Sequence, residues 1–89
     1  MDTVGEVRDM LAQAEFFLRA ADPNGAAARG RQALRLATDA LGPDAEITQE
    51  AALELERFDT AARAWREEAA AREQLRDLHQ ADSNSFWNV

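Results

Sequence analysis

The chain has 89 residues, which is enough for one small domain, and carries 17 acidic residues against 10 Arg, with no Lys and no Cys. Its net charge of −7 repels phosphate backbones and disfavours nucleic acid as a partner, while the absence of Cys excludes disulfides, thiolate zinc sites and a Cys nucleophile. Because a domain of this size buries only a modest share of its surface, it often depends on a partner for stability.

The first predicted helix begins at Thr3. Thr3 and Glu6 have the spacing of a capping box, in which the hydroxyl and the carboxylate satisfy free backbone donors at a helix start. Apolar residues follow at three- and four-residue steps and predict one apolar face, which another element must cover. The face comprises Val4, Val7, Met10, Leu11, Ala14, Phe17, Leu18 and Ala21.

A second helix is predicted between Asp22 and Gly42. Asp22 is expected to cap it, with Pro23 at the first helical position, where the missing amide donor of proline carries no penalty. Gly42 is expected to end the helix in a left-handed conformation. Since almost no loop separates the two helices, they should form an antiparallel hairpin. Small residues that would allow a neighbouring helix to approach closely are Ala26, Ala27 and Gly30.

A long third helix is predicted after Pro43, because no Gly or Pro occurs beyond that residue. It should run from Asp44 to about Ala81, with apolar residues on two faces. The first face comprises Ile47, Ala51, Leu55, Phe58, Ala62, Trp65 and Ala69. The second face comprises Leu53, Ala64, Ala71, Leu75 and Leu78.

One hairpin cannot cover both faces of the third helix, which leaves two arrangements open. Either the helix is continuous and its second face meets another chain, or it breaks near Phe58 to Thr60 and the chain forms a four-helix arrangement. Acid–Arg pairs four residues apart favour the continuous helix, because such pairs stabilise one turn against the next. The pairs are Asp59 with Arg63 and Glu68 with Arg72.

The predicted fold class is therefore all-α, an antiparallel two-helix hairpin plus a long third helix. A single helical domain should cover residues 1–81. Residues 82–85, Asp-Ser-Asn-Ser, are expected to stop the third helix because their side chains offer the backbone competing hydrogen bonds. Residues 82–89 would then form an aromatic C-terminal tail.

Small and aromatic residues recur at fixed steps in the predicted hairpin, at Ala14, Phe17, Ala21, Ala26 and Ala33. Over residues 10–41 this pattern resembles a tetratricopeptide repeat, a pair of antiparallel helices, with Ala21 in place of the usual turn glycine. Thr38 stands where the repeat closes with proline, and Gly30 occupies the usual aromatic position. The resemblance implies a protein-binding scaffold without catalytic residues. Residues that hint at a degenerate second unit are Phe58, Ala62 and Ala69.

Residues that could carry chemistry are few. Glu46, Glu50 and Glu54 lie four residues apart and form an acidic ridge, which predicts a solvated face or a contact for a basic partner more than a metal site. Arg72 and His79 superficially resemble the Arg-and-His motif of small helical ribonucleases, but no polar companion accompanies them. The sequence therefore predicts no catalytic residue, no cofactor and no metal.

Three Arg residues, Arg29, Arg31 and Arg35, form a local positive cluster in the second helix. The acidic excess of the chain lies after Pro43, so the cluster is expected to pair with the third helix, within the chain or across a dimer. The alternative is an anionic ligand, although no glycine-rich phosphate loop accompanies the cluster.

Partner-binding residues are expected in the second half of the third helix and in the tail. Trp65 continues the stripe of Ile47 and Phe58, so it is also a candidate core residue. The aromatic pair of the tail could fold back over the chain, insert into the groove of a partner, or help present the terminal carboxylate for capture. The expected partner-binding residues are Trp65, Leu75, Leu78, Phe86, Trp87 and Val89.

These features favour a non-catalytic protein-interaction module, such as a small adaptor, accessory subunit or chaperone-like protein, that associates with itself as a homodimer. Acidic side chains around the anchors would steer a basic protein partner. The alternatives are an acidic antitoxin or immunity protein that neutralises a basic partner, and a small helical enzyme or metal-binding protein. Without a signal peptide or an apolar run of membrane length, a cytoplasmic protein is expected, and the Arg-only, Ala-rich usage is typical of a GC-rich bacterial genome.

Overall fold

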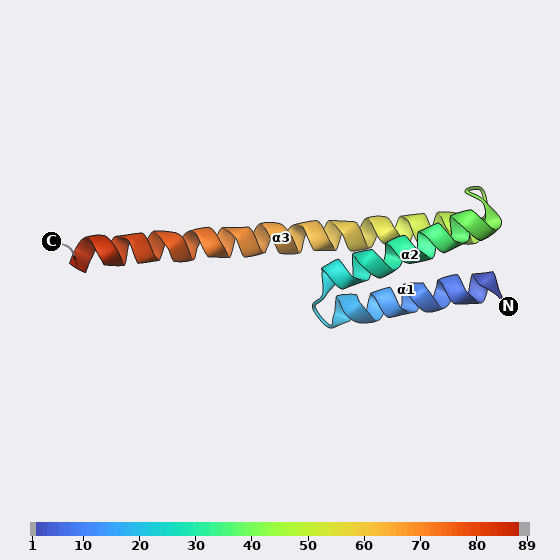
Figure 1. Cartoon of the computed structure of the whole chain (residues 1–89), viewed down its shortest axis with the longest axis horizontal. Coiled ribbons are helices and arrows are strands. Elements are labelled where there is room, and N and C mark those ends of the chain that lie inside the picture. The colour runs from blue at the N-terminus through green and yellow to red at the C-terminus, as the bar shows by residue number, and fades with distance from the viewer. Residues whose placement is uncertain (1, 88–89) are drawn as a thin grey trace.

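The chain folds into a helical hairpin from which a long third helix projects (Figure 1). The computed structural model describes the backbone of residues 2–87 and the side chains of residues 2–79. The helices are α1 (Thr3–Arg19), α2 (Pro23–Leu41) and α3 (Glu46–Trp87), and both α1 and α3 pack against α2. The molecule measures 70 × 21 × 14 Å, because α3 continues far past the end of the hairpin. The predicted all-α fold, a hairpin plus a long third helix, is confirmed.

Helix α1 begins at Thr3 as expected, but the predicted capping box is wrong. Asp2, not Thr3, is the N-cap residue, and its side chain makes no capping hydrogen bond. Thr3 already has helical geometry, so its hydroxyl is one position too late to cap the free amides.

The turn between α1 and α2 is built by Ala21, which adopts a φ of 62°. The amide of Ala21 donates to the carbonyl of Leu18, and the amide of Asp22 donates to the carbonyl of Phe17. These two bonds form a Schellman motif, whose left-handed position is usually occupied by glycine. The Asp22 side chain then accepts a hydrogen bond from the amide of Gly25 at 3.0 Å and caps α2, as predicted.

Gly42 ends α2 with a φ of 87° and a ψ of 164°. The expectation of a positive φ is confirmed, but the ψ lies in an extended region that is open almost only to glycine, not in the left-handed helical region. The buried hydroxyl of Thr48 donates to the Gly42 carbonyl at 2.8 Å and fastens the turn to the first turn of α3.

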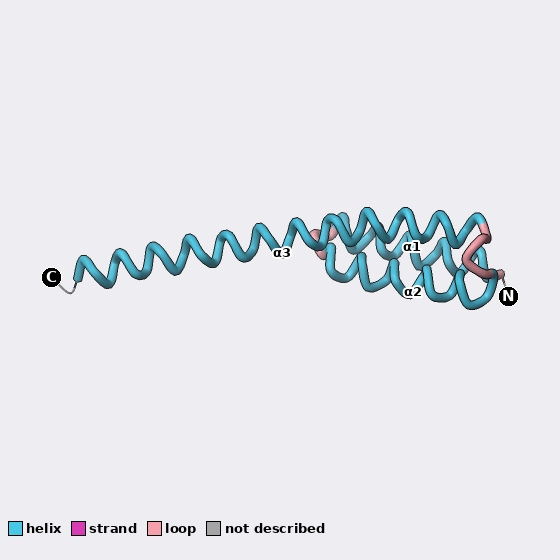
Figure 2. Tube along the Cα trace, turned by 90° about the horizontal axis from the view of Figure 1, so that it is seen from above, coloured by secondary structure: helices cyan, strands magenta, loops and turns pink. Residues whose placement is uncertain are grey.

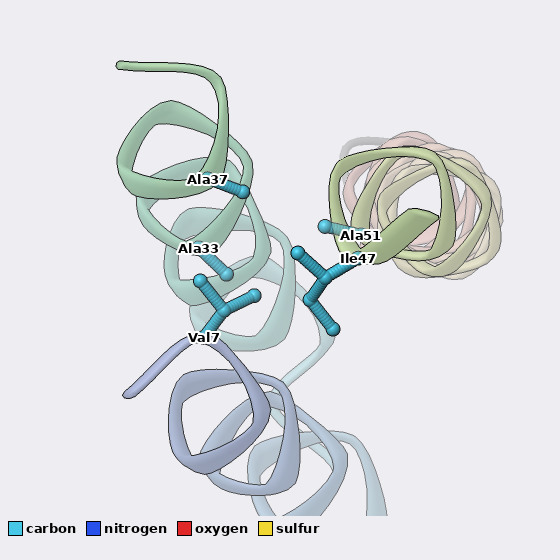
Figure 3. Packing of buried hydrophobic residues seen from close by; sticks show 5 residues of the cluster. All are labelled: Val7, Ala33, Ala37, Ile47 and Ala51. Atoms are coloured by element: carbon cyan, nitrogen blue, oxygen red, sulfur yellow. The ribbon is translucent and has the colours of Figure 1, made fainter. Parts of the chain in front are cut away.

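The core is narrow and consists largely of alanine. Near the free ends of the hairpin, side chains from all three helices point toward one another (Figure 3), and they comprise Val7, Ala33, Ala37, Ile47 and Ala51. A second cluster near the α1–α2 turn comprises Ala14, Ala26, Ala27, Phe58 and Ala62. Gly30 is buried between these clusters, where an added Cβ would lie 3.0 Å from the Phe58 ring, so the predicted close approach of a helix is confirmed.

Helix α3 is continuous through residues 58–60, so the alternative four-helix arrangement is wrong. The expected helix end at Ala81 is also wrong, because the backbone stays helical to Trp87. Asp, Ser and Asn have only modestly lower helix propensity than the residues before them, and no Gly or Pro forces a break. Residues 82–87 therefore extend the helix and do not form a separate non-helical tail.

Candidate functional site

The outer stripe of α3 is the main exposed apolar surface in the described part of the chain. We define it by the residues Leu53, Ala64, Ala71, Leu75 and Leu78, all of which are exposed. At about 100° per residue they fall within a sector about 60° wide. The exposed fractions of the three leucines are 68%, 58% and 63% for Leu53, Leu75 and Leu78.

The outer stripe faces away from the hairpin. The residues of α3 that the hairpin buries are Ile47, Ala51, Phe58 and Ala62. Their mean direction lies about 140° around the helix from the outer stripe. The prediction that one hairpin covers only one apolar face of the third helix is confirmed.

Trp65 lies at the end of the hairpin and is 43% exposed, so the interpretation of Trp65 as a core residue is wrong. The buried stripe stops at Ala62 because the hairpin extends no farther along α3. The turn that joins the end of α1 to the start of α2 lies at this level (Figure 1). An open groove, which we call the end groove, forms where the α1–α2 turn meets α3. It is lined by Leu18, Ala21, Pro23, Ala61, Ala64, Trp65 and Glu68.

Sequence reasoning placed Trp65 among the partner-binding residues but missed the hairpin side of the end groove. Leu18, Ala21 and Pro23 come from the α1–α2 turn, and the shape of that turn depends on the positive φ of Ala21. Alanine gives no sequence signal for a positive φ, so the position of the turn beside Trp65 could not be read from the chain.

Ion pairs hold the first half of α3 against the hairpin. Arg57 donates hydrogen bonds to Glu15 of α1 and, at 2.7 Å, to Glu54 of its own helix. The bond from Arg57 lowers the pKa of the Glu15 carboxyl below its usual value, and the same bond raises the pKa of Arg57. The Arg57–Glu15 pair joins α3 to α1, although such an exposed pair adds little stability.

The predicted pairing of the Arg cluster with the third helix is confirmed for Arg31, which donates to Asp59 at 3.0 Å. Arg29 instead donates to Gln32 within α2 at 2.8 Å. Farther along α3, Arg66 donates to Asn24 at 3.0 Å and forms the last hydrogen bond between α3 and the hairpin among the described side chains.

Beyond Arg66, α3 projects as a single helix (Figure 2). We call residues 66–87 the projecting segment, and every side chain described in it is exposed. Residues 66–79 contain four acidic residues against three Arg, so this stretch is close to neutral. Glu68 and Arg72 pair at 2.6 Å, as expected from their spacing. The acidic excess of α3 lies instead on the half that packs against the hairpin.

Leu75 and Leu78 lie on the projecting segment, one helical turn apart on the same face. Trp65 is separated from them by about 15 Å along the helix axis and faces a different direction. The backbone at Phe86 and Trp87 continues α3, but their side chains, and the whole of Val89, lie outside the described residues. The structure thus places Leu75 and Leu78 together and Trp65 apart.

The candidate chemical groups do not converge. Glu46 and Glu50 line a groove near Arg8, whereas Glu54 is paired with Arg57. Within the part of the chain that the structure describes, no group of three or more His, Asp or Glu residues could hold a metal ion. His79 is exposed on the projecting segment.

No described helix is both long enough and apolar enough to span a bilayer. Comparison with protein-family models, with curated proteins and with solved structures finds no match to this chain. The resemblance of the hairpin to a tetratricopeptide repeat stays a prediction. The hint of a second repeat does not agree with α3, which continues straight where a second hairpin would need a turn.

Proposed function

We propose that this protein is a non-catalytic protein-interaction module, in which the hairpin anchors one half of α3 and the other half binds a partner helix. The observation that carries the proposal is the outer stripe, a line of exposed apolar side chains on a helix that the hairpin covers only on the opposite side of its first half. Amphipathic helices of this kind bind by laying their apolar positions against another helix.

The projecting segment gains from a partner because nothing in the described chain packs against it. Most helical stability in proteins comes from packing of an apolar face, and the described side chains of this segment have no such packing. Ala69, Ala70 and Ala71 favour the helix, and the Glu68–Arg72 pair adds a few tenths of a kcal/mol. Contact along Leu75 and Leu78 would supply the missing packing.

The charge of the projecting segment favours an apolar partner surface over a strongly basic one. Four acidic residues against three Arg in residues 66–79 give little field to attract a cationic protein. This argues for an adaptor or accessory subunit rather than an antitoxin or immunity protein that covers a basic enzyme with negative charge.

Site-specific photo-cross-linking tests this function. A photoreactive residue replaces Leu78 in one variant and Phe16 in a matched control, since both side chains are about two-thirds exposed and Phe16 lies on the hairpin. We expect strong, saturable cross-links to protein from position 78 and only weak background from position 16, in host extract or with the purified chain. Equal yields from both positions, or none from position 78, would refute the proposal.

A further inference from the structure

We infer that the partner of the projecting segment is a second copy of this chain, which pairs with it in the antiparallel direction. The inference rests on the proposed function and names the occupant of the outer stripe. It is carried by the direction of the stripe, by the length of the projecting segment, and by the place of one acidic residue at the edge of the stripe.

A second copy has unobstructed access to the outer stripe. The hairpin lies about 140° around α3, and it ends near Trp65. The near-neutral charge of residues 66–79 means that two copies of this stretch repel each other only weakly, despite the −7 charge of the whole chain.

The antiparallel register follows from the two leucines. In this register Leu75 of one copy lies level with Leu78 of the other, and Leu78 with Leu75. Any two residues whose numbers add to 153 then lie at the same height along the pair. Residue 87 of one copy then lies level with residue 66 of the other, so each described helix ends where the opposite hairpin begins. The two projecting segments, each about 33 Å long, then overlap over their whole length.

Glu68 decides against the parallel direction. It lies between Ala64 and Leu75 along α3, at the edge of the stripe and about 20° around the helix from Leu75. A parallel pair in register would bring Glu68 of one copy close to Glu68 of the second copy at the edge of the contact, and like charges close together are unfavourable. In the antiparallel register Glu68 lies level with position 85, which is Ser in the sequence, and the two Glu68 residues are about 25 Å apart.

The antiparallel register also brings the end of α3 in one copy level with the end groove of the other. Positions 86 and 87 of one copy, which are Phe and Trp in the sequence, come level with residues 67 and 66 of the other, just past Trp65 along the helix. The end groove opens at that point and is apolar apart from Glu68.

Sedimentation equilibrium of the purified full chain tests self-association. We expect the wild type to dimerise at micromolar concentration, and the double variant Leu75→Gln/Leu78→Gln to associate about 100-fold more weakly or not at all, since four buried leucines are lost per dimer. Gln keeps the charge and nearly the helix propensity of Leu. Leu53→Gln is the matched control: Leu53 is equally exposed on the stripe but outside the antiparallel overlap, so the dimer should be unchanged.

Spin labels on a single cysteine test the direction, because the native chain has no Cys. Arg63 is exposed and points away from both the stripe and the hairpin. In the dimer of Arg63→Cys, the antiparallel register predicts about 40 Å between the labelled backbones, whereas a parallel pair would place them about 10 Å apart. A short distance, or loss of dimer in Leu53→Gln, would overturn the antiparallel inference.

If the wild-type chain stayed monomeric at concentrations up to 100-fold above one micromolar, the inference of self-association would be wrong. If position 78 then still cross-linked to a different protein in host extract, the proposed interaction function would survive while this inference failed. If the chain neither dimerised nor cross-linked to another protein from position 78, the proposed function and this inference would both fail.

Discussion

Gly30 of α2 lies against the side chain of Phe58 of α3, and a methyl group at position 30 would come within 3.0 Å of Phe58 Cδ2 and 3.2 Å of Leu55 Cδ1. Phe58 is completely buried and is the largest side chain in the described core. The absence of a side chain at position 30 therefore lets α2 and α3 approach closely at this point.

Gly30→Ala should destabilise the chain by about 1–3 kcal/mol, because the added methyl overpacks the α2–α3 contact. In an exposed helix the same change would stabilise by up to about 1 kcal/mol, so the sign is diagnostic. Urea denaturation followed by circular dichroism measures it. Gly5→Ala serves as the control, since its new methyl meets only the movable carboxylate of Asp2. Equal stability of Gly30→Ala and wild type would contradict the packing described here.

Ala21→Gly should stabilise the chain by about 0.5–1 kcal/mol. Ala21 holds a left-handed conformation that is unfavourable for any residue with a Cβ, and relief of this strain outweighs the entropy that glycine adds to the unfolded chain. Thermal unfolding provides the readout. Ala12→Gly, at an exposed position inside α1, should instead lower stability by about 1 kcal/mol. Destabilisation by both changes would show that Ala21 is not left-handed.

The Glu15–Arg57 pair should make stability depend on pH in the acid range. The hydrogen bond from Arg57 lowers the pKa of Glu15 in the folded chain, so its contribution is complete above the unfolded pKa of about 4.3 and is lost as the pH falls through the lower folded value. Glu15→Gln should therefore flatten the fall in urea midpoint below about pH 4.3.

The effect of this exposed pair should shrink in 1 M salt, where charges are screened. Glu67→Gln, on the projecting segment, is the control and should follow the wild-type pH profile. A profile of Glu15→Gln that coincides with wild type at low salt would show that the pair does not form in solution.

Thr48→Val should destabilise the chain by about 1 kcal/mol, because the buried hydroxyl that bonds the Gly42 carbonyl is lost while the shape of the side chain is kept. Thr60→Val removes a similar bond, to the carbonyl of Glu56, from an exposed position of α3 and should change stability by less than about 0.5 kcal/mol. Two equal effects in urea denaturation would mean that Thr48 does not fasten the α2–α3 turn.

Much of the fold could be predicted from the residues that start and end helices and from the spacing of apolar residues. Asp22 and Pro23 mark the start of α2 through capping chemistry, which depends on neighbouring residues alone. Gly42 marks its end for the same reason. The separation of α3 into a buried and an exposed face followed from residue spacing, since a helix fixes the direction of every side chain around its axis.

Sequence reasoning missed features that depend on competition between neighbouring residues or on how the helices pack in space. Asp2 and Thr3 are both good N-cap residues, and the pattern alone could not decide between them. The polar run at 82–85 lowers helix propensity but does not end the helix. Trp65 continues the buried stripe in sequence, yet it lies past the end of the hairpin and so stays exposed.

The central claim is that the second half of α3 is not supported by its own chain and depends on a partner. Amide hydrogen exchange of the wild type and of Leu75→Gln/Leu78→Gln at equal micromolar concentration tests it most directly. We predict that residues 66–79 exchange at least about tenfold faster in the variant, while residues 47–62 keep the same protection in both proteins. Equal and strong protection of residues 66–79 in the two proteins would show that this helix stands without a partner, and would contradict the account.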